Sequence, residues 1–368
     1  MPADGSLRFD PKDAFKEKSP LIASGKFYFP KTRYAGSKRR LSEWLQEKLQ
    51  PLTFRTALDA FGGTGTVSMM LLQMDKEVSF HDCFAFNQVS ARALLTNRIP
   101  QISRQEFQAK LESVKRKNGF ISKTFQGMFY PDDENQWLDG LQHLIQSGIS
   151  DSEADIIRYC AYQACLQKRP YNMFHRPNLH LRTSKNVVRS FGNLTTWQRT
   201  FNELMLRSYE ELRATRERLP KSAKVLKPTG LMRLPTGFDL VYLDPPYLKS
   251  SKNESYLRRY HFLEGFTKPL DWPGLVDQES PIKSFSEPYL PEDWENPKSA
   301  LLMLEKIISR HKQSIVALSY LSGGVPGVDE VKSIFKKNFF RYRLHKLPFN
   351  YALSHRSVNE LLFIGYPR

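Results

Sequence analysis

A strand, a glycine-rich turn and a helix follow one another early in the chain, and this order is the strongest constraint on its fold. Residues 55–61 are predicted to form a strand, residues 62–66 contain three glycines, and residues 67–72 have helical character. Such a unit is the nucleotide-binding half of a doubly wound sheet, in which glycines let the backbone approach a ligand closely. The spacing differs from the dinucleotide GxGxxG, and no lysine follows to bind a phosphate. The turn therefore predicts an adenosine-type ligand without a pyrophosphate.

The next predicted strand, residues 77–81, ends at Asp82. An acidic residue about twenty positions beyond the glycines suits a ribose, because a carboxylate can accept hydrogen bonds from both hydroxyls of the diol. Asp82 could instead cap the helix expected over residues 87–98. The two roles are compatible, and the glycines before Asp82 favour the ribose.

A second apolar run, residues 238–243, leads into Asp244-Pro245-Pro246-Tyr247. We interpret the run as a buried strand that enters a tight turn. The prolines fix φ and donate no hydrogen bond, so their carbonyls and the Asp244 carboxylate can all accept from one NH2 group. Tyr247 can stack on the ring that carries this amine. An ordinary proline-rich turn is the alternative.

A basic segment near the N-terminus could place a ring and an ammonium around one ligand. Tyr34, Gly36 and Lys38 precede a helix predicted over residues 41–49. Taken alone, this segment could equally be a solvated helix start. Its position ahead of the other two motifs gives it more weight.

The order of these motifs resembles that of the S-adenosylmethionine-dependent amino-methyltransferases of DNA, in particular the adenine-specific group with the alpha-type order. That group has an aromatic-Gly-Lys motif, a Phe-x-Gly-x-Gly loop, a target-recognition segment and then Asp-Pro-Pro-Tyr. The resemblance runs from residue 33 to the C-terminus and is weakest over residues 101–224. His81 and Cys83 flank the acid where the family more often has an Asn-Asp-Ile type of sequence. Three later segments also match: residues 260–265, 315–320 and 360–365.

The resemblance implies an α/β fold, a doubly wound and mostly parallel Rossmann-like sheet with an inserted, largely helical target-recognition lobe. It also implies S-adenosylmethionine as the methyl donor and flipping of the target base out of the duplex. The implied catalytic residues are Asp244, Pro245, Pro246 and Tyr247. The implied cofactor-binding residues are Tyr34, Lys38, Asp59, Phe61, Gly63, Gly65, Asp82 and Asp244.

The charge of the chain favours a polyanionic partner. Lys and Arg number 55 against 38 Asp and Glu, which gives a net charge of +17. Between Ile156 and Asn202 there is no acidic residue, so we expect the cations there to face phosphates. The polar, loop-like part from Lys168 to Trp197 is the best candidate for reading sequence, because Arg can read guanine and Asn can read adenine in the major groove. The alternatives are a merely basic protein and a surface loop without specificity.

Six residues of this segment are predicted to contact double-stranded DNA: Lys168, Arg169, Asn172, His175, Arg176 and Arg182. Tyr171 or Phe174 could intercalate or fill the space left by a flipped base, although either could belong to the core.

Three parts are expected along the chain. Residues 1–30 form an irregular arm, residues 31–100 and 228–368 form the catalytic domain, and residues 101–227 form the inserted DNA-binding domain. Residues 269–298 are expected to be a long insertion beside the catalytic turn. Helices of the inserted domain are expected near residues 104–116, 136–146, 151–166 and 196–218.

Several classes of protein are disfavoured. The three cysteines lack CxxC spacing, which indicates neither a zinc site nor a disulfide framework. No apolar run approaches the roughly 20 residues of a membrane span, and the start of the chain is too polar for a signal peptide. We therefore expect a cytoplasmic protein without a metal. The sequence leaves open whether a cognate restriction endonuclease is its functional partner, and it leaves the oligomeric state open, with a monomer favoured. N6-adenine methylation of DNA is the leading function; N4-cytosine or RNA adenine methylation, or DNA binding without catalysis, are the alternatives.

Overall fold

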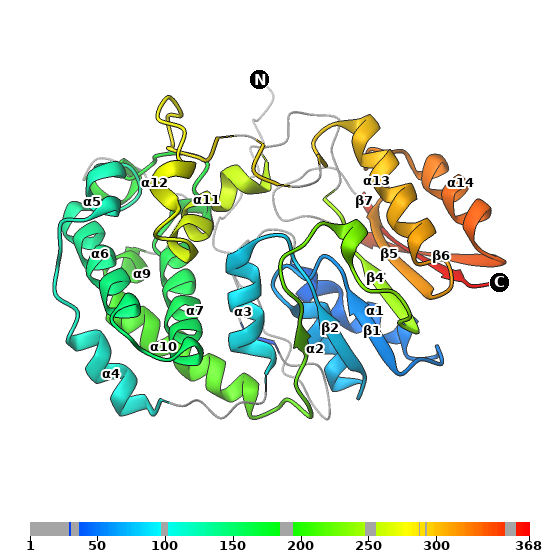
Figure 1. The fold of residues 1–368 in the computed structure, drawn as a ribbon, viewed down its shortest axis with the longest axis horizontal. Coiled ribbons are helices and arrows are strands. Elements are labelled where there is room, and N and C mark those ends of the chain that lie inside the picture. Colours follow the sequence, from blue (N-terminus) through cyan, green and yellow to red (C-terminus); the bar gives the residue numbers. More distant parts are fainter. Residues whose placement is uncertain are drawn as a thin grey trace, which may run out of the picture.

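A seven-stranded sheet with helices on both faces lies beside a helical lobe, and helix α3 (Ala85–Leu95) runs between them (Figure 1). None of the described helices combines the length and the apolar character that a bilayer span requires. The computed structural model describes residues 29–30, 37–96, 102–184, 194–246, 255–286, 288–290, 293–349 and 358–368.

The strands lie in the order β3-β2-β1-β4-β5-β7-β6. Strands β1 to β5 are parallel, whereas β7 is antiparallel to both of its neighbours. The predicted α/β fold with a mostly parallel sheet is confirmed. Strands β3 and β6 were not predicted from the sequence. β3 has only two residues, and β6 is rich in cations. The strands are β1 Thr56–Asp59, β2 Glu77–Phe80, β3 Lys224–Val225, β4 Leu240–Leu243, β5 Ile315–Leu321, β6 Arg341–Phe349 and β7 Val358–Tyr366.

Each face of the sheet is buried by its own helices, because side chains alternate along a strand. Ala57 and Tyr242 belong to the core on one face, which also contains residues of α1 and α2. Leu58 and Val241 belong to the core on the other face, together with residues of α13 and α14. The helices of this part are η1 Lys38–Leu41, α1 Ser42–Leu49, α2 Thr66–Gln73, η3 Leu231–Arg233, α13 Pro297–Arg310 and α14 Val328–Asn338.

The strand order reverses between β1 and β4. The chain passes from β1 to β2 on one side and returns to β4 on the other, where Asp59 is the register partner of Tyr242. In open α/β sheets, ligands bind beyond the carboxyl ends of the strands at such a switch point. The glycine turn follows β1 and the Asp-Pro-Pro turn follows β4, so both motifs lie there.

Most of the inserted segment is helical. Three of its helices begin at capping boxes, which start at Ser103, Ser150 and Thr200. The box at Thr200 begins a new helix, which is why the helix predicted over residues 196–218 is two helices in the structure. The chain rejoins the sheet slightly before residue 228, since Lys224 is paired with Ser79. The helices are α4 Arg104–Glu112, α5 Phe120–Thr124, α6 Asp132–Gln146, α7 Asp151–Gln167, η2 Pro170–Asn172, α8 His180–Thr183, α9 Leu194–Gln198 and α10 Phe201–Arg216.

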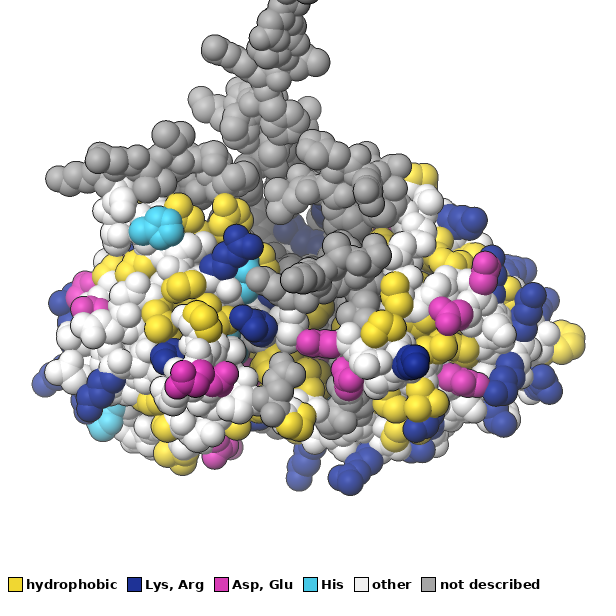
Figure 2. Space-filling model, turned by 90° about the horizontal axis from the view of Figure 1, so that it is seen from above, with side chains coloured by type: hydrophobic (Ala, Val, Ile, Leu, Met, Phe, Trp, Pro, Cys, Tyr) yellow, Lys and Arg dark blue, Asp and Glu magenta, His cyan; other side chains and the backbone are white. Residues whose placement is uncertain are grey.

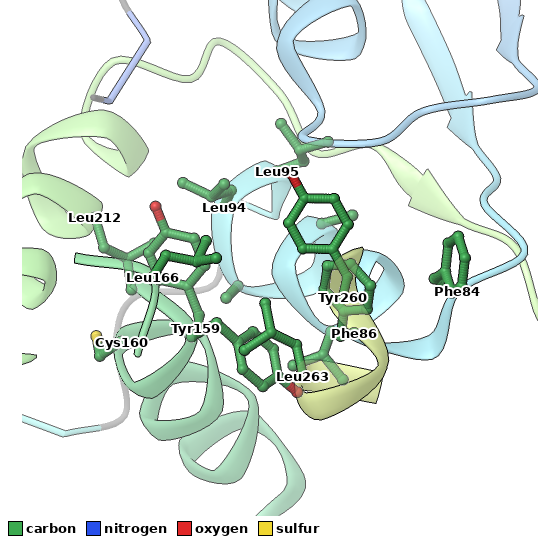
Figure 3. Packing of buried hydrophobic residues seen from close by; sticks show 14 of the residues in the cluster. Phe84, Phe86, Leu94, Leu95, Tyr159, Cys160, Leu166, Leu212, Tyr260 and Leu263 are labelled. Atoms are coloured by element: carbon green, nitrogen blue, oxygen red, sulfur yellow. The ribbon is translucent and has the colours of Figure 1, made fainter. Parts of the chain in front are cut away.

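Two helices that follow the catalytic turn, α11 (Tyr256–Thr267) and α12 (Trp272–Leu275), pack against this lobe. The ring of Trp272 lies 5.3 Å from that of Phe125 and 5.2 Å from that of Phe262. Figure 3 shows side chains of α3, α7 and α11 in one cluster, among them Phe86, Tyr159 and Leu263. The lobe and the sheet therefore share a hydrophobic core, and α12 anchors part of the predicted insertion at residues 269–298.

Candidate active site

The glycine turn has a backbone that requires glycine. Gly63 and Gly65 have φ values of +50° and +80°, which side-chain-bearing residues rarely adopt. A Cβ on Gly62 would lie 2.0 Å from a carbon of the Phe80 ring, so this position has no room for a side chain. A Cβ on Gly63 would meet only a backbone oxygen at 4.0 Å. The turn is therefore packed beneath Gly62 and open at Gly63.

Asp82, which follows β2, holds this turn from the neighbouring strand. Its Oδ2 accepts a hydrogen bond from Gly63 N at 2.8 Å, and its Oδ1 accepts one from Phe84 N at 2.9 Å. Burial raises the pKa of Asp82, against the opposing effect of these hydrogen bonds. The bond to Phe84 gives Asp82 a role at the start of α3. The Asn87 side chain also hydrogen-bonds to this carboxylate, and its remaining accepting capacity is available to another donor.

Asp59, at the end of β1, is a buried carboxylate with spare accepting capacity. Ser68 Oγ donates to its Oδ2 at 2.7 Å. No donor among the described residues lies within hydrogen-bonding distance of its Oδ1. Burial raises the pKa of Asp59 to about 7, although the bond from Ser68 acts in the opposite direction. Buried oxygens normally accept a hydrogen bond, so Asp59 Oδ1 is a suitable partner for a donor group of a ligand.

Lys38 and Asp244 form an ion pair, with 2.9 Å between Nζ and Oδ1. Lys38 is buried and Asp244 is half-buried. Lys38 begins η1, which the Ser37 hydroxyl links to Thr66 of α2 at 3.3 Å between the two hydroxyl oxygens. Asp244 directly follows β4. The pair joins the N-terminal motif to the Asp-Pro-Pro turn.

Glu360 of β7 is a third buried charge in this region. Its register partner on β5 is Leu321. The charge of Glu360 raises the pKa of both Lys38 and Asp244, so it acts on both members of the ion pair. A lone acid in the apolar run 360–364 was a visible signal, but nothing in the sequence connects it to Lys38.

Burial has the largest effect on both groups of the ion pair. It raises the pKa of Asp244 to about 6, while the charge and hydrogen bond of Lys38 lower it. For Lys38, burial lowers the pKa, but the charges of Asp244 and Glu360 outweigh it and the net change is a raised pKa. The ion pair is therefore charged on both sides at neutral pH, and Asp244 becomes protonated in mildly acidic solution.

Aromatic residues also belong to the segments around this site. Phe61, at the end of the strand–turn unit, makes an edge contact with Trp294 at 5.4 Å between ring centroids. Burial and the charge of Asp244 raise the pKa of Tyr256, the first residue of α11. Pro245 is buried and Pro246 half-buried, in the turn after β4. The predicted residues Tyr34 and Tyr247 lie outside the described residues.

Three of the predicted DNA contacts are internal. Lys168 Nζ lies 2.6 Å from Glu134 Oε1, and Arg182 donates to both oxygens of the same carboxylate. The expectation that these cations need phosphates to relieve repulsion is therefore wrong, because α6 supplies the anion. Arg169 is 2% exposed. Its guanidinium donates to three carbonyls, those of Phe129, Met173 and Arg176, and to the Asn178 side chain.

The other predicted DNA contacts, Asn172, His175 and Arg176, belong to the loop whose carbonyls accept hydrogen bonds from Arg169. Tyr171 and Asn172 have φ values of +62° and +55°, a strained conformation for residues other than glycine. Tyr171 is 43% exposed, whereas Phe174 is fully buried and stacks on Phe262 at 4.8 Å. Phe174 therefore belongs to the core, and Tyr171 is the aromatic residue available at the surface.

His175 is half-buried and Arg176 is exposed in the same loop. Seen from above, Lys and Arg side chains are spread over both the lobe and the sheet side of the described surface (Figure 2). This view therefore shows no single basic face, and the role of the loop in DNA binding stays a prediction from its residues.

Comparison with known proteins agrees with this geometry. The chain is 22% identical over 348 residues to the Type II methyltransferase M2.HphI of Haemophilus parahaemolyticus, an alignment that covers 91% of this chain and 97% of the relative. Residues 34–267 match the profile of the D12 class N6 adenine-specific DNA methyltransferases. This match spans the N-terminal motif, the glycine turn, the inserted segment and the catalytic turn. The chain is thus an enzyme that belongs to the D12 class N6 adenine-specific DNA methyltransferase family.

Proposed function

We propose that this enzyme transfers a methyl group from S-adenosylmethionine to the N6 amine of adenine within a short, specific site of double-stranded DNA, after the adenine has left the duplex. The main support is that several groups lie together at the switch point of the sheet. They are the Lys38–Asp244 pair, Asp59, Asp82 and the glycine turn. Family membership gives the reaction class. The donor and the residue roles are inferred.

The described residues fit S-adenosylmethionine. The ammonium of its methionine part would supply the donor that Asp59 Oδ1 lacks among the described residues. Asp82 would accept from the ribose hydroxyls with its remaining lone pairs, and the open space at Gly63 would admit the ligand. Lys38 would lie on the side of the methionine carboxylate. Three further residues would line the pocket: Tyr34, Phe61 and Gly65.

Asp244 and the Pro245 carbonyl would accept hydrogen bonds from the two protons of the adenine amine. This arrangement favours a tetrahedral nitrogen, whose lone pair is less delocalised into the ring. When bound, S-adenosylmethionine would supply an electrophilic methyl carbon for the nitrogen lone pair, with its sulfur as the leaving group. Ionised Asp244 would be in position to accept the amine proton. Pro246 would shape the turn, and Tyr247 would stack on the flipped base.

For DNA recognition, we propose direct contacts by Asn172, His175 and Arg176, with Tyr171 as the residue that enters the duplex. The exposure and strained backbone of Tyr171 support this role. The internal cations Lys168, Arg169 and Arg182 would act by shaping the lobe and its loop. Their direct contact with DNA would require the lobe to rearrange.

We also propose that the enzyme is a monomer and acts on cytoplasmic DNA. Methylation would protect a site from a cognate restriction endonuclease, a role that the Type II relative supports. Asp rather than Ser at position 244 favours adenine over the N4 amine of cytosine. The complete set of charged groups in the site argues against a DNA-binding subunit without activity.

Labelled methyl transfer tests the proposal directly. Purified enzyme, S-adenosylmethionine labelled in the methyl group, and plasmid DNA are combined, and the nucleosides are separated. Label in N6-methyladenine, with none in N4-methylcytosine, is expected, and long-read sequencing of the same DNA should show one short motif. Label only in cytosine or only in added RNA would reject the proposal, as would absence of label with every tested DNA.

A further inference from the structure

Glu264 of α11 reaches across the boundary between the lobe and the sheet. It is fully buried. Its Oε1 accepts a hydrogen bond from Ala85 N and its Oε2 accepts one from Phe86 N, both at 3.1 Å. These amides belong to the first turn of α3, which has no partner for them within its own helix. A carboxylate is favoured there by the helix dipole as well.

The same turn of backbone is attached to Asp82. Phe84 N donates to Asp82, while Ala85 N and Phe86 N donate to Glu264, so three consecutive amides are divided between two carboxylates. The other oxygen of Asp82 holds Gly63 N of the glycine turn. A shift of the first turn of α3 would therefore reorient Asp82 and disturb the turn beside it.

Glu264 is itself held firmly from the lobe side. Lys268 Nζ lies 3.1 Å from its Oε1, and the Tyr289 hydroxyl donates to the same oxygen. Lys268 also donates to the Tyr289 hydroxyl at 2.6 Å. Burial and the charge of Glu264 raise the pKa of Tyr289, which keeps this phenol protonated as a donor. The carboxylate thus has a fixed place from which to orient α3.

We infer that Glu264 is a positioning residue for the methyl donor: through the first turn of α3 it fixes the orientation of Asp82 and so sets the affinity for S-adenosylmethionine. The inference rests on the proposed role of Asp82 in holding the ribose. Glu264 itself touches neither the donor nor the adenine. Its effect should therefore appear in donor binding and not in the rate of methyl transfer from the filled site.

The test is the variant Glu264→Gln, which keeps the size of the side chain but removes the charge and one accepting oxygen. We expect its Kd for S-adenosylmethionine in calorimetry, and its KM for the donor, to rise about tenfold, since a hydrogen bond to a charged group is lost. The kcat at saturating donor and the KM for DNA should stay within about threefold. In an Asp82→Asn background, the same change should have little further effect on donor affinity.

Glu203→Gln is a control at a helix start away from the proposed donor site. Glu203 also accepts from a backbone amide, at 2.7 Å from Thr200 N, but it is exposed and lies in α10. Because Gln also suits this position of a capping box, the variant should lose little stability and keep the donor affinity of the parent. If Glu264→Gln and Glu203→Gln gave the same pattern, Glu264 would be only structural and the inference would fail.

The outcomes separate this inference from the proposed function. A parent enzyme that does not bind S-adenosylmethionine would reject the proposed function. A parent that binds it, with Glu264→Gln binding equally well or losing only kcat, would reject the inference alone. If Glu264→Gln does not fold, Tyr289→Phe decides: it removes one hydrogen bond to Glu264, and an unchanged KM for the donor would overturn the inference.

Discussion

Replacing Lys38 by Met should shift the pH dependence of methyl transfer, because Lys38 holds the Asp244 carboxylate in its charged form. With Lys38 in place, burial raises the pKa of Asp244 only to about 6. An opposite charge at this range lowers a carboxyl pKa by roughly 1–3 units. Loss of Lys38 should therefore move the acidic limb of the kcat profile from near pH 6 to about 1–3 pH units higher.

The stability of the variant should follow the same titration. Removing one member of a buried ion pair costs about 3–5 kcal/mol when the other charge stays in place. In the variant, the folded-state pKa of Asp244 is raised further above its unfolded value, so the protonated form is favoured in the folded protein. The free energy of unfolding should therefore be closer to that of the parent at pH 5. It should fall below that of the parent as the pH rises from about 6 towards the new pKa, and the difference should stay constant above it.

Stopped assays of methyl transfer and urea unfolding, each between pH 5 and 9, measure the two effects. Lys48→Met is the control, since Lys48 lies in the adjacent helix α1 and pairs with the exposed Glu47 at 2.6 Å. Its pH profile should match that of the parent. An acidic limb that stays near pH 6 in Lys38→Met, or moves to lower pH, would refute the role given to the ion pair. Saturating S-adenosylmethionine is used throughout, because Lys38 is also proposed to bind the donor.

Three other perturbations probe the catalytic turn and the DNA loop. Asp244→Ala should abolish labelled methyl transfer yet leave DNA affinity in gel-shift assays within a few-fold, because the carboxylate acts on the flipped base; transfer near the parent rate would contradict its catalytic role. Arg169→Ala should lower the free energy of unfolding by roughly 3 kcal/mol, because it leaves buried carbonyls without donors. Arg176→Ala should instead weaken DNA binding with little change in the melting temperature. The opposite result for the two variants would mean that Arg176 is the structural residue and Arg169 the DNA contact. Tyr171→Ala should reduce the fluorescence increase of 2-aminopurine placed at the target adenine, with unchanged affinity for free S-adenosylmethionine; an unchanged increase would remove Tyr171 from base flipping.

The cofactor side of the site was predictable because its residues are tied to strand ends. Asp59, Asp82 and Asp244 each follow an apolar run, and parallel strands bring their carboxyl ends to one edge. Lys38 was found through its motif. Glu360 was not, because its position depends on the antiparallel insertion of β7, which no local pattern specifies.

The helical lobe was less predictable, because its ion pairs join segments that are distant in the sequence. Lys168 and Arg182 lie in a stretch without acids, but both pair with the single carboxylate of Glu134 in α6. The break between α9 and α10 was visible in the sequence, since Thr200 and Glu203 have the spacing of a capping box. Glu264 also gave no local signal, because its partners are backbone amides of α3.

The place of β7 in the sheet has a consequence for synthesis of the enzyme. β7 lies between β5 and β6, although it follows both of them along the chain. A nascent chain that stops before residue 358 would leave β5 and β6 without their shared neighbour and would lack Glu360. We therefore expect the charges proposed for catalysis to reach their final arrangement only after residues 358–366 have been made, so that shorter chains cannot methylate DNA.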